Sequence, residues 1–383
     1  MVWMKYKLKD IYDLQMGKTP SRNNSEYWNT KENKWISIAD LTKTGKYISE
    51  TKEYLSKSAV LESGIRVIPA DTVVMSFKLS IGKTAITAEN MYSNEAIMAF
   101  HDKHVVDILP EYIYYMFTYK NWDEGSNKAV MGKTLNKAIL SEVEIEICPI
   151  EKQQAIVDVL DKMMLVLEDK ERELSLLDDL IKARFVEMFG GYERFTTVGN
   201  YIAELRGGKS LAGTEPCKNK VLKTGAATFG WFDPEQYKYL PQDYEPLPEH
   251  RVKTGDVMVS RMNTPELVGA GSYVFEAPED MYYPDRLWKV IPKNQANPIF
   301  IWQLLWDPEI RRQIKEKSGG TSGTMHNISK QKLLEIKCID VPVNEQNNFS
   351  DFVVKVNKSK VAVQKSLEKT QLLFDSLMQG YFG

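Results

Sequence analysis

The sequence predicts an α+β protein made of two similar modules of mixed sheet and short helices, with one long helix after each module. Three observations lead to this prediction. A set of landmarks recurs in the same order after about 190 residues, which is the mark of an internal repeat. A heptad pattern of apolar residues follows each copy. The 383 residues exceed one ordinary domain, and a hydrophobic content of 43% is enough to form sizeable cores.

The first landmarks are a turn and a strand. A short apolar stretch leads to Gly-Lys-Thr at 17–19 in the first copy and to Gly-Lys-Ser at 208–210 in the second. A strand opened by an acidic residue is predicted next, over 71–76 and over 256–260. A glycine-containing loop follows each of these strands, so the two copies agree in order as well as in type.

The next landmark is an aromatic helix that begins with a proline. Pro110 opens it in the first copy and Pro298 in the second, a position where the missing N–H of proline costs nothing. A loop rich in Gly, Ser and Lys comes after the helix and ends at Asn136 or Asn327. A further short strand is predicted after each loop. The modules are therefore assigned to residues 1–150 and 191–341.

Two long helices are predicted over 151–190 and 342–383. Their apolar positions keep a 4-3-4-3 rhythm from Ile156 and from Phe349, which is typical of a coiled coil. Polar residues interrupt the seam at Lys170, Arg184, Lys360 and Thr370. Globular helices average only about 11–12 residues, so helices of this length need a partner along their whole length. We expect them to pair antiparallel, with one module at each end; the alternative is that each helix packs only on its own module.

Composition limits the class of protein. The net charge of −2 gives no general attraction to nucleic acid, so a DNA-binding surface would have to come from local clusters. No apolar run is long enough to span a bilayer, and the first ten residues do not resemble a signal peptide. The three cysteines form no C-x-x-C pair and indicate reduced thiols. We therefore expect a cytoplasmic protein.

The sequence offers no catalytic or metal site. Gly-Lys-Thr/Ser occurs four times, but none has the upstream glycine of a P-loop. Residues 297–300 and 268–271 approach adenine methyltransferase motifs in the wrong order and context, so this enzyme class is set aside. His101 and His104 have metal-like spacing, but no Cys or further His lies nearby to complete a site.

Basic and polar loop residues remain as candidates for DNA contact. Arginine suits guanine and asparagine suits adenine, while Lys, Ser and Thr can bind phosphate. The candidates in the first copy are Lys18, Thr19, Ser21, Arg22, Lys78, Lys83, Lys128, Lys133, Asn136 and Lys137. Those in the second copy are Arg206, Lys209, Ser210, Ser260, Arg261, Asn263, Thr264, Thr321, Ser322, Thr324, His326, Asn327 and Lys330.

This layout resembles the specificity (S) subunit of type I restriction-modification systems. The resemblance covers essentially the whole chain, and its specificity comes from the order of the motifs rather than from any single one. The segments that carry it are 17–20, 149–153, 185–190, 260–269, 320–330 and 374–382. The second copy lacks an equivalent of Pro20 after its Gly-Lys turn, which puts contacts transferred to that turn in doubt.

The resemblance implies a function for each part. Each module would be a target-recognition domain that reads one half of a bipartite double-stranded DNA site. The helices would set the spacing and dock two modification (methyltransferase) subunits, with two restriction subunits in the full complex. S-adenosylmethionine, ATP and Mg²⁺ would be bound by those partners and not by this chain. The alternative is a non-catalytic coiled-coil scaffold that joins two ligand-binding modules.

Overall fold

The computed structural model of the chain describes residues 3–78, 80–122, 135–293, 295–322 and 324–383, with only the backbone described at 321 and 322. Two compact units make up the chain. Unit 1 comprises Met1–Glu171 with Lys365–Gly383, and unit 2 comprises Arg172–Gln364. Each unit thus holds one predicted module and parts of both long helices.

Unit 1 is built on a five-stranded sheet. Its order is β2 (Tyr12–Met16), β9 (Ile97–Asp102), β6 (Val73–Ser76), β7 (Thr84–Thr87) and β4 (Tyr47–Ile48). A three-stranded sheet contains β5 (Glu53–Leu55), β3 (Asn33–Ile36) and β8 (Tyr92–Ser93), and a ribbon pairs β1 (Met4–Lys7) with β10 (Glu144–Ile147). The short helices are α1 (Leu8–Ile11), η1 (Ser25–Tyr27), α2 (Ile38–Lys43), α3 (Lys57–Ser63), α4 (Pro110–Tyr119) and α5 (Lys137–Glu142).

Unit 2 repeats this plan. Its main sheet has the order β12 (Ile202–Gly207), β19 (Leu287–Pro292), β15 (Val257–Ser260) and β17 (Gly271–Tyr273). The second sheet is β14 (Tyr237–Tyr239), β13 (Lys220–Leu222) and β18 (Met281–Tyr282), and the ribbon is β11 (Phe195–Thr197) with β22 (Lys337–Ile339). A further small sheet contains β16 (Met262–Asn263), β21 (Met325–Asn327) and β20 (Gly319–Ser322). The short helices are η2 (Val198–Asn200), η3 (Thr224–Ala227), η4 (Pro248–His250), α7 (Pro298–Leu304), α8 (Pro308–Lys317) and α9 (Lys330–Leu334).

Strand pairing confirms the predicted repeat. In unit 1, β9 is antiparallel to both β2 and β6, and in unit 2 β19 is antiparallel to both β12 and β15. The second sheets agree too, since β3 and β13 are each antiparallel to one neighbour and parallel to the other. The two modules therefore share one topology, as the recurring landmarks predicted.

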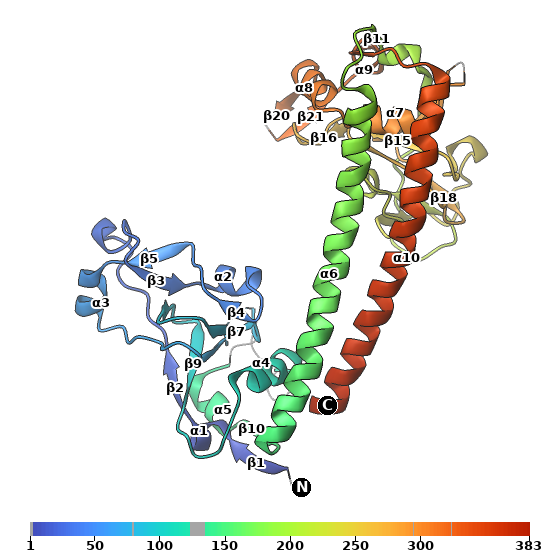
Figure 1. Cartoon of the computed structure of the whole chain (residues 1–383). Helices are drawn as coiled ribbons and strands as arrows, with labels where there is room; N and C mark the ends of the chain where they lie inside the picture. The colour runs from blue at the N-terminus through green and yellow to red at the C-terminus, as the bar shows by residue number, and fades with distance from the viewer. Residues whose placement is uncertain (1–2, 79, 123–134, 294, 323) are drawn as a thin grey trace. The chain divides into compact units, whose positions relative to one another are not determined.

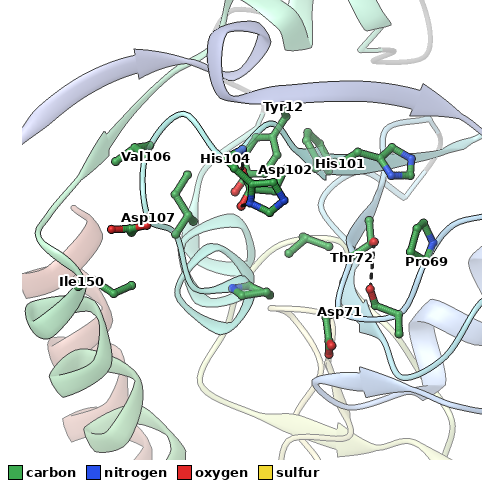
Figure 2. Close-up of a pocket in the computed structure, with 15 residues that line it drawn as sticks. Tyr12, Pro69, Asp71, Thr72, His101, Asp102, His104, Val106, Asp107 and Ile150 are labelled. Carbon is green, nitrogen blue, oxygen red and sulfur yellow. Dashed lines mark hydrogen bonds and ion pairs between the residues drawn. The ribbon is translucent and has the colours of Figure 1, made fainter.

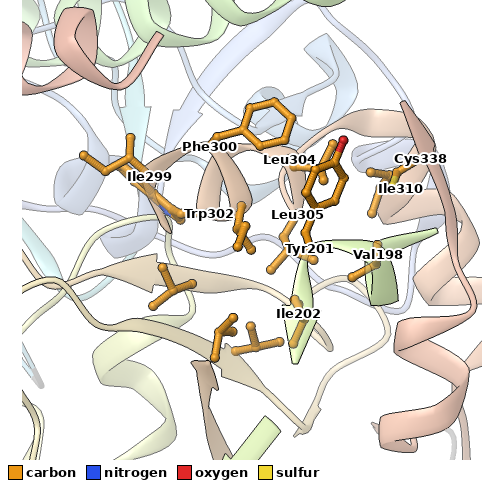
Figure 3. Close-up of a cluster of buried hydrophobic side chains, with 14 of the residues drawn as sticks. Val198, Tyr201, Ile202, Ile299, Phe300, Trp302, Leu304, Leu305, Ile310 and Cys338 are labelled. Carbon is orange, nitrogen blue, oxygen red and sulfur yellow. The ribbon is translucent and has the colours of Figure 1, made fainter. Parts of the chain in front are cut away.

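The proline-opened helices form the centre of each core. Pro110 and Pro298 occupy the first turn of α4 and α7, as predicted. Figure 3 shows Phe300 of α7 among the buried apolar side chains of unit 2, where it is fully buried and its ring lies 5.4 Å from that of Tyr201. Tyr112 of α4 has the corresponding place in unit 1, two residues after the proline, where it is fully buried and its ring lies 5.4 Å from that of Phe382. Each helix also packs on the main sheet of its unit, α4 against β6 and β7, and α7 against β15 and β17.

The long helices are α6 (Ile150–Phe189) and α10 (Val343–Phe382), each of 40 residues, or about 60 Å at 1.5 Å per residue. They run side by side (Figure 1). In unit 2 the end of α6 contacts the start of α10, with the rings of Phe185 and Phe349 5.4 Å apart. In unit 1 the start of α6 packs with the end of α10, around Leu160 and Met378. The predicted antiparallel pair is therefore confirmed.

The polar positions of the seam are half-buried, as the heptad pattern predicted. Lys170, Arg184, Lys360 and Thr370 all have intermediate exposure. Within unit 2, Lys360 Nζ lies 2.5 Å from Asp178 Oδ1, so α10 supplies the cation and α6 the anion. Such a polar contact in an apolar seam disfavours alternative helix registers. None of the helices in the described part of the chain has both the length and the apolar character that a bilayer span requires.

Candidate nucleic-acid interface

Three segments meet at one end of the main sheet of unit 2. Because β19 is antiparallel to β12 and β15, the last residues of those two strands lie beside its first residues: Gly207 pairs with Trp288, and Ser260 with Leu287. The loops that leave this end contain residues 208–210, 261–264 and 284–286. We call it the loop edge of unit 2. It brings together predicted candidates that are about 50 residues apart in sequence.

Two arginines lie next to each other at the loop edge of unit 2. The backbone N–H of Arg261 donates to the carbonyl of Arg286 at 2.9 Å. Arg286 is exposed and Arg261 is half-exposed. Lys209 joins them through the turn, since the N–H of Gly208 donates to the carbonyl of Pro284 at 3.0 Å. Arg286 was missed from the sequence, because no motif surrounds it.

The small sheet extends the loop edge. Met262 pairs with Asn327, and Asn263 pairs with His326, so two candidate loops that were predicted separately form one structure. Asn263 uses its side-chain oxygen to accept from the N–H of Thr264 at 2.9 Å. The side-chain oxygen of Asn327 is buried without a hydrogen-bond partner among the described residues. Thr324 precedes Asn327 and Lys330 follows it in the same segment, whereas the side chains of Thr321 and Ser322 are outside the described part.

The same edge exists in unit 1. Met16 at the end of β2 pairs with Met98, and Ser76 at the end of β6 pairs with Ile97. The loops at this end carry several predicted basic and polar residues: Lys18, Thr19, Lys78 and Lys83. Lys83 is exposed and Lys78 half-exposed. We call this the loop edge of unit 1.

A hydroxyl–carboxylate contact recurs at both loop edges. The Thr19 hydroxyl donates to the carboxylate of Glu95, and the Ser210 hydroxyl donates to that of Asp285. Each acid stands two residues before the second strand in the order of its main sheet, β9 or β19. The Thr19 hydrogen bond lowers the pKa of Glu95 from its usual value. These contacts fasten the Gly-Lys turn to the sheet in both modules.

Close backbone approach explains the glycine of each turn. A Cβ atom at Gly17 would lie 2.2 Å from the carbonyl oxygen of Asn94, and one at Gly208 would lie 1.9 Å from that of Tyr283. Real Cβ atoms do not approach oxygen so closely, so no other residue fits without a shift of the backbone. The Gly-Lys turns are thus structural elements that present the following lysine and hydroxyl residue.

Three of the predicted basic contact residues are also engaged within the protein. Lys18 Nζ donates to the carbonyl of Ser63 at 2.5 Å. Arg22 pairs with Glu53 and lies 3.7 Å above the ring of Trp28. Arg206 pairs with Glu204 at 2.7 Å, which raises the arginine pKa. A DNA contact by any of these residues would have to compete with these partners.

The remaining candidates of unit 1 are distributed differently. Lys128 and Lys133 lie outside the described residues. Asn136 is the N-cap of α5 and accepts from the N–H of Ile139 at 2.9 Å, with exposed Lys137 after it. Ser329 has the same position before α9, so Ser329 and not Asn327 is the structural counterpart of Asn136. Ser21 is exposed, and its carbonyl accepts from the indole of Trp28.

The histidine pair lies in a pocket of unit 1 of about 580 Å³. Figure 2 shows the rings of His101 and His104 on different parts of its wall. His101 Nε2 is 3.1 Å from Gln15 Oε1, and His104 Nδ1 is 3.3 Å from Asp102 Oδ2. Burial lowers the pKa of His101. Within the described residues no three metal-ligating side chains come together.

The fragments that approach methyltransferase motifs have structural roles. Asn297 caps α7, because its side-chain oxygen accepts from the N–H groups of Ile299 and Phe300. The glycine stretch at 268–271 leads into strand β17, as its alternating sequence indicated. Gly269 has a φ of 72° and lies over Ile314 of α8. Both segments therefore form part of the framework of unit 2.

Comparison with known proteins gives consistent matches. A family described as the type I restriction modification DNA specificity domain matches residues 2–175. The chain is 30% identical over 197 residues to the type I restriction enzyme MjaIX specificity subunit of Methanocaldococcus jannaschii, covering 50% of this chain and 45% of that protein. It is 29% identical over 152 residues to the EcoR124I/EcoR124II specificity subunit of Escherichia coli, covering 38% and 37%. The matched segments span less than half the length of these relatives.

Solved structures share the whole fold. The S subunit of a type I restriction-modification system from M. genitalium has a TM-score of 0.57 at 15% identity, covering 100% of this chain and 96% of that one. A chain from a structure on complex assembly and conformational transition of the type I R-M system has a TM-score of 0.60 at 14% identity, covering 99% and 97%. Residues 2–175 therefore match the type I restriction modification DNA specificity domain, and the chain as a whole has the fold of the solved S subunits.

Proposed function

We propose that this chain is the sequence-specific DNA-binding subunit of a type I restriction-modification complex. Each loop edge contacts one half of a bipartite double-stranded DNA site. The observation that carries the proposal is the convergence of separate candidate segments at the same sheet edge in both units. Two copies of one framework that carry different loop residues suit the reading of two different half-sites.

Local charge supports contact with a polyanion despite the net charge of −2. The loop edge of unit 2 presents Arg261, Arg286 and Lys209, and that of unit 1 presents Lys78 and Lys83. Phosphate contacts by a few such cations provide most of the affinity of non-specific DNA binding and align the protein on the duplex. Specific readout then depends on the residues that reach base edges.

The two long helices act as the spacer in this proposal. Residues 1–150 and 191–341 are the recognition domains, and 151–190 and 342–383 are the helices that fix the distance between half-sites. The helices also expose large apolar side chains: Leu165, Leu176, Leu180, Leu372 and Leu373 are each about half or more exposed. Apolar surface of this kind supports docking of a protein partner.

A repeated concavity supports two copies of one partner. In unit 2 a cavity of about 1160 Å³ lies between the end of α6 and the ribbon β11–β22, next to Phe195, which is 69% exposed. In unit 1 a cavity of about 460 Å³ lies between the end of α10 and the ribbon β1–β10. These related sites suit two modification (methyltransferase) subunits, to which two restriction subunits are added in the complete cytoplasmic complex.

This chain contributes recognition and no catalysis. S-adenosylmethionine, ATP and Mg²⁺ belong to the partner subunits in this proposal. Where they lie in the described residues, the segments that approach nucleotide or methyltransferase motifs serve as turns, a helix cap and a strand. The Gly-Lys-Thr at 132–134 lies outside the described residues. Its chemistry is therefore that of hydrogen bonds and ion pairs to DNA.

Selection from a random duplex library tests the proposal. The full chain, co-purified with its modification subunits, should enrich DNA with two short conserved blocks separated by a spacer of fixed length. Affinity should fall steeply as salt rises, because phosphate contacts release counterions. Enrichment of one continuous block, or no enrichment at all, would contradict the proposal and favour the scaffold that binds no DNA.

A further inference from the structure

The arginines of unit 2 differ sharply in whether they have partners. Unit 2 contains nine arginines, and all lie in the described part of the chain. Seven of them contact other groups: Arg172, Arg184, Arg194, Arg206, Arg251, Arg311 and Arg312. The side chains of Arg261 and Arg286 have no hydrogen bond, ion pair or ring contact with any described residue. These two are the neighbours at the loop edge.

Backbone pairing concentrates positively charged residues at the loop edge of unit 2. The backbone hydrogen bond of 2.9 Å between Arg261 and Arg286 fixes two cations in adjacent loops, with Lys209 in the third loop. Asp285 is the nearest acid in sequence, but its carboxylate accepts from the Ser210 hydroxyl. Three basic residues in neighbouring loops, two of them arginines without a side-chain partner among the described residues, suit a ligand that supplies negative charge or hydrogen-bond acceptors.

Comparison with unit 1 distinguishes the residues that both modules share from the residues that are specific to unit 2. The hydroxyl–carboxylate contact and the glycine of the turn occur in both units, so they belong to the common framework. The arginine pair does not recur. Phe77 follows β6 where Arg261 follows β15, and Ala96 precedes β9 where Arg286 precedes β19; both are buried. A feature of one module only is what a half-site-specific contact requires.

We propose that Arg261 and Arg286 read guanine in the half-site of unit 2. The guanidinium fork donates two parallel hydrogen bonds, which match the O6 and N7 acceptors of guanine in the major groove. No other base presents this pair of acceptors there. The inference rests on the proposed DNA-binding function and adds the base that this unit prefers and the residues that select it.

Charge-conserving variants separate base reading from phosphate contact. Arg286→Lys and Arg261→Lys keep one positive charge at each position but lose the fork. In the co-purified complex, we expect each variant to lose about tenfold or more of the preference for guanine at one position of this half-site. The slope of affinity against salt should stay unchanged, because the charge remains. Arg312→Lys, on the outer face of α8 between Glu309 and Glu316, is the matched control.

The outcomes distinguish this inference from the proposed function. If the wild-type complex selects no bipartite site, the proposed function fails. If it selects one, and both lysine variants keep the wild-type preference at every position, the arginines contact only phosphate and the inference is overturned. The inference is also overturned if the lysine variants lose affinity equally for all DNA sequences. Loss of guanine preference in the half-site of unit 2 alone supports the inference.

Discussion

The side-chain oxygen of Gln153 accepts a hydrogen bond from the backbone N–H of Leu109 at 2.9 Å, and Gln346 does the same for Asn297 at 2.9 Å. Each glutamine also donates to the carbonyl two residues before its own long helix. Both side chains are buried, with 0% and 1% exposure. This contact joins the start of each long helix to the residue that caps α4 or α7, so it fixes each helix to its module.

Replacing this glutamine should destabilise its unit. Gln153→Ala leaves a buried N–H and buried carbonyls without partners, which should lower the free energy of unfolding by about 2–4 kcal/mol. Urea denaturation measures the effect. Gln154→Ala is the control, because Gln154 is exposed and contacts only Asp158 one turn away. Equal stability of the two variants would contradict the structural role.

The Gly-Lys turn should not accept a side chain. Gly17→Ala places a methyl group 2.2 Å from the carbonyl oxygen of Asn94, so the turn must move and unit 1 should lose about 2 kcal/mol or more. Gly45→Ala, where no atom lies within 4 Å of the added carbon, should change stability little. Thermal unfolding compares the two. A Gly17→Ala protein as stable as the Gly45→Ala protein would show that the turn adapts.

The contact between Thr19 and Glu95 should be visible in a titration. The hydroxyl favours the ionised carboxylate and lowers its pKa, so its stabilising effect is complete above the usual glutamate pKa and is lost as pH falls through the lowered value. Thr19→Val should therefore raise the pKa of Glu95 towards its usual value. Carboxyl NMR measures this change. An unchanged pKa would mean that the hydroxyl does not donate to Glu95 in solution.

Arg311 should position the loop at 261–269. Its Nη2 donates to the carbonyl of Glu266 at 2.6 Å, and its guanidinium lies 5.4 Å from the ring centroid of Trp306. Its Nη1 is buried without a partner among the described residues, and burial lowers its pKa to about 10.

We expect Arg311→Met to leave the melting temperature nearly unchanged, since it removes a poorly compensated buried charge. DNA affinity should fall about tenfold, because the reading loop loses a charge-assisted hydrogen bond. Arg312→Met removes the same charge from the exposed face of α8 and should affect affinity much less. Calorimetry and duplex titration measure the two effects. Equal affinity of both variants would show that Arg311 does not position the loop.

The architecture was predictable because its signals are long or repeated. Heptads over about 35 residues and recurring landmarks are stronger signals than any single strand. The small sheet β16–β21–β20 was not predicted, because its strands have only 2 to 4 residues and come from loops far apart in sequence. The sequence matches Asn136 to Asn327, but the structural counterpart of Asn136 is Ser329. The two copies cap the corresponding helix with different residues, Asn in one and Ser in the other.

The candidate site was predictable in its segments but not in its free side chains. Arg22 looks available in the sequence, yet its partner Glu53 lies 31 residues away and is brought near only by folding. Arg286 follows an acidic residue in a loop without a motif, and only the register of β15 and β19 places it beside Arg261. The order of the strands determines which loops lie at the loop edges. Which side chains form ion pairs depends on side-chain geometry, which cannot be predicted from the sequence.

The most direct measurement is a genome-wide map of methylated bases in cells that contain this chain with its modification subunits. Residues 191–341 are then exchanged for the second module of another specificity subunit. We expect a bipartite methylated motif in which the exchange alters one half and leaves the other half and its spacing unchanged. A motif that changes in both halves, or one that is not bipartite, would contradict it.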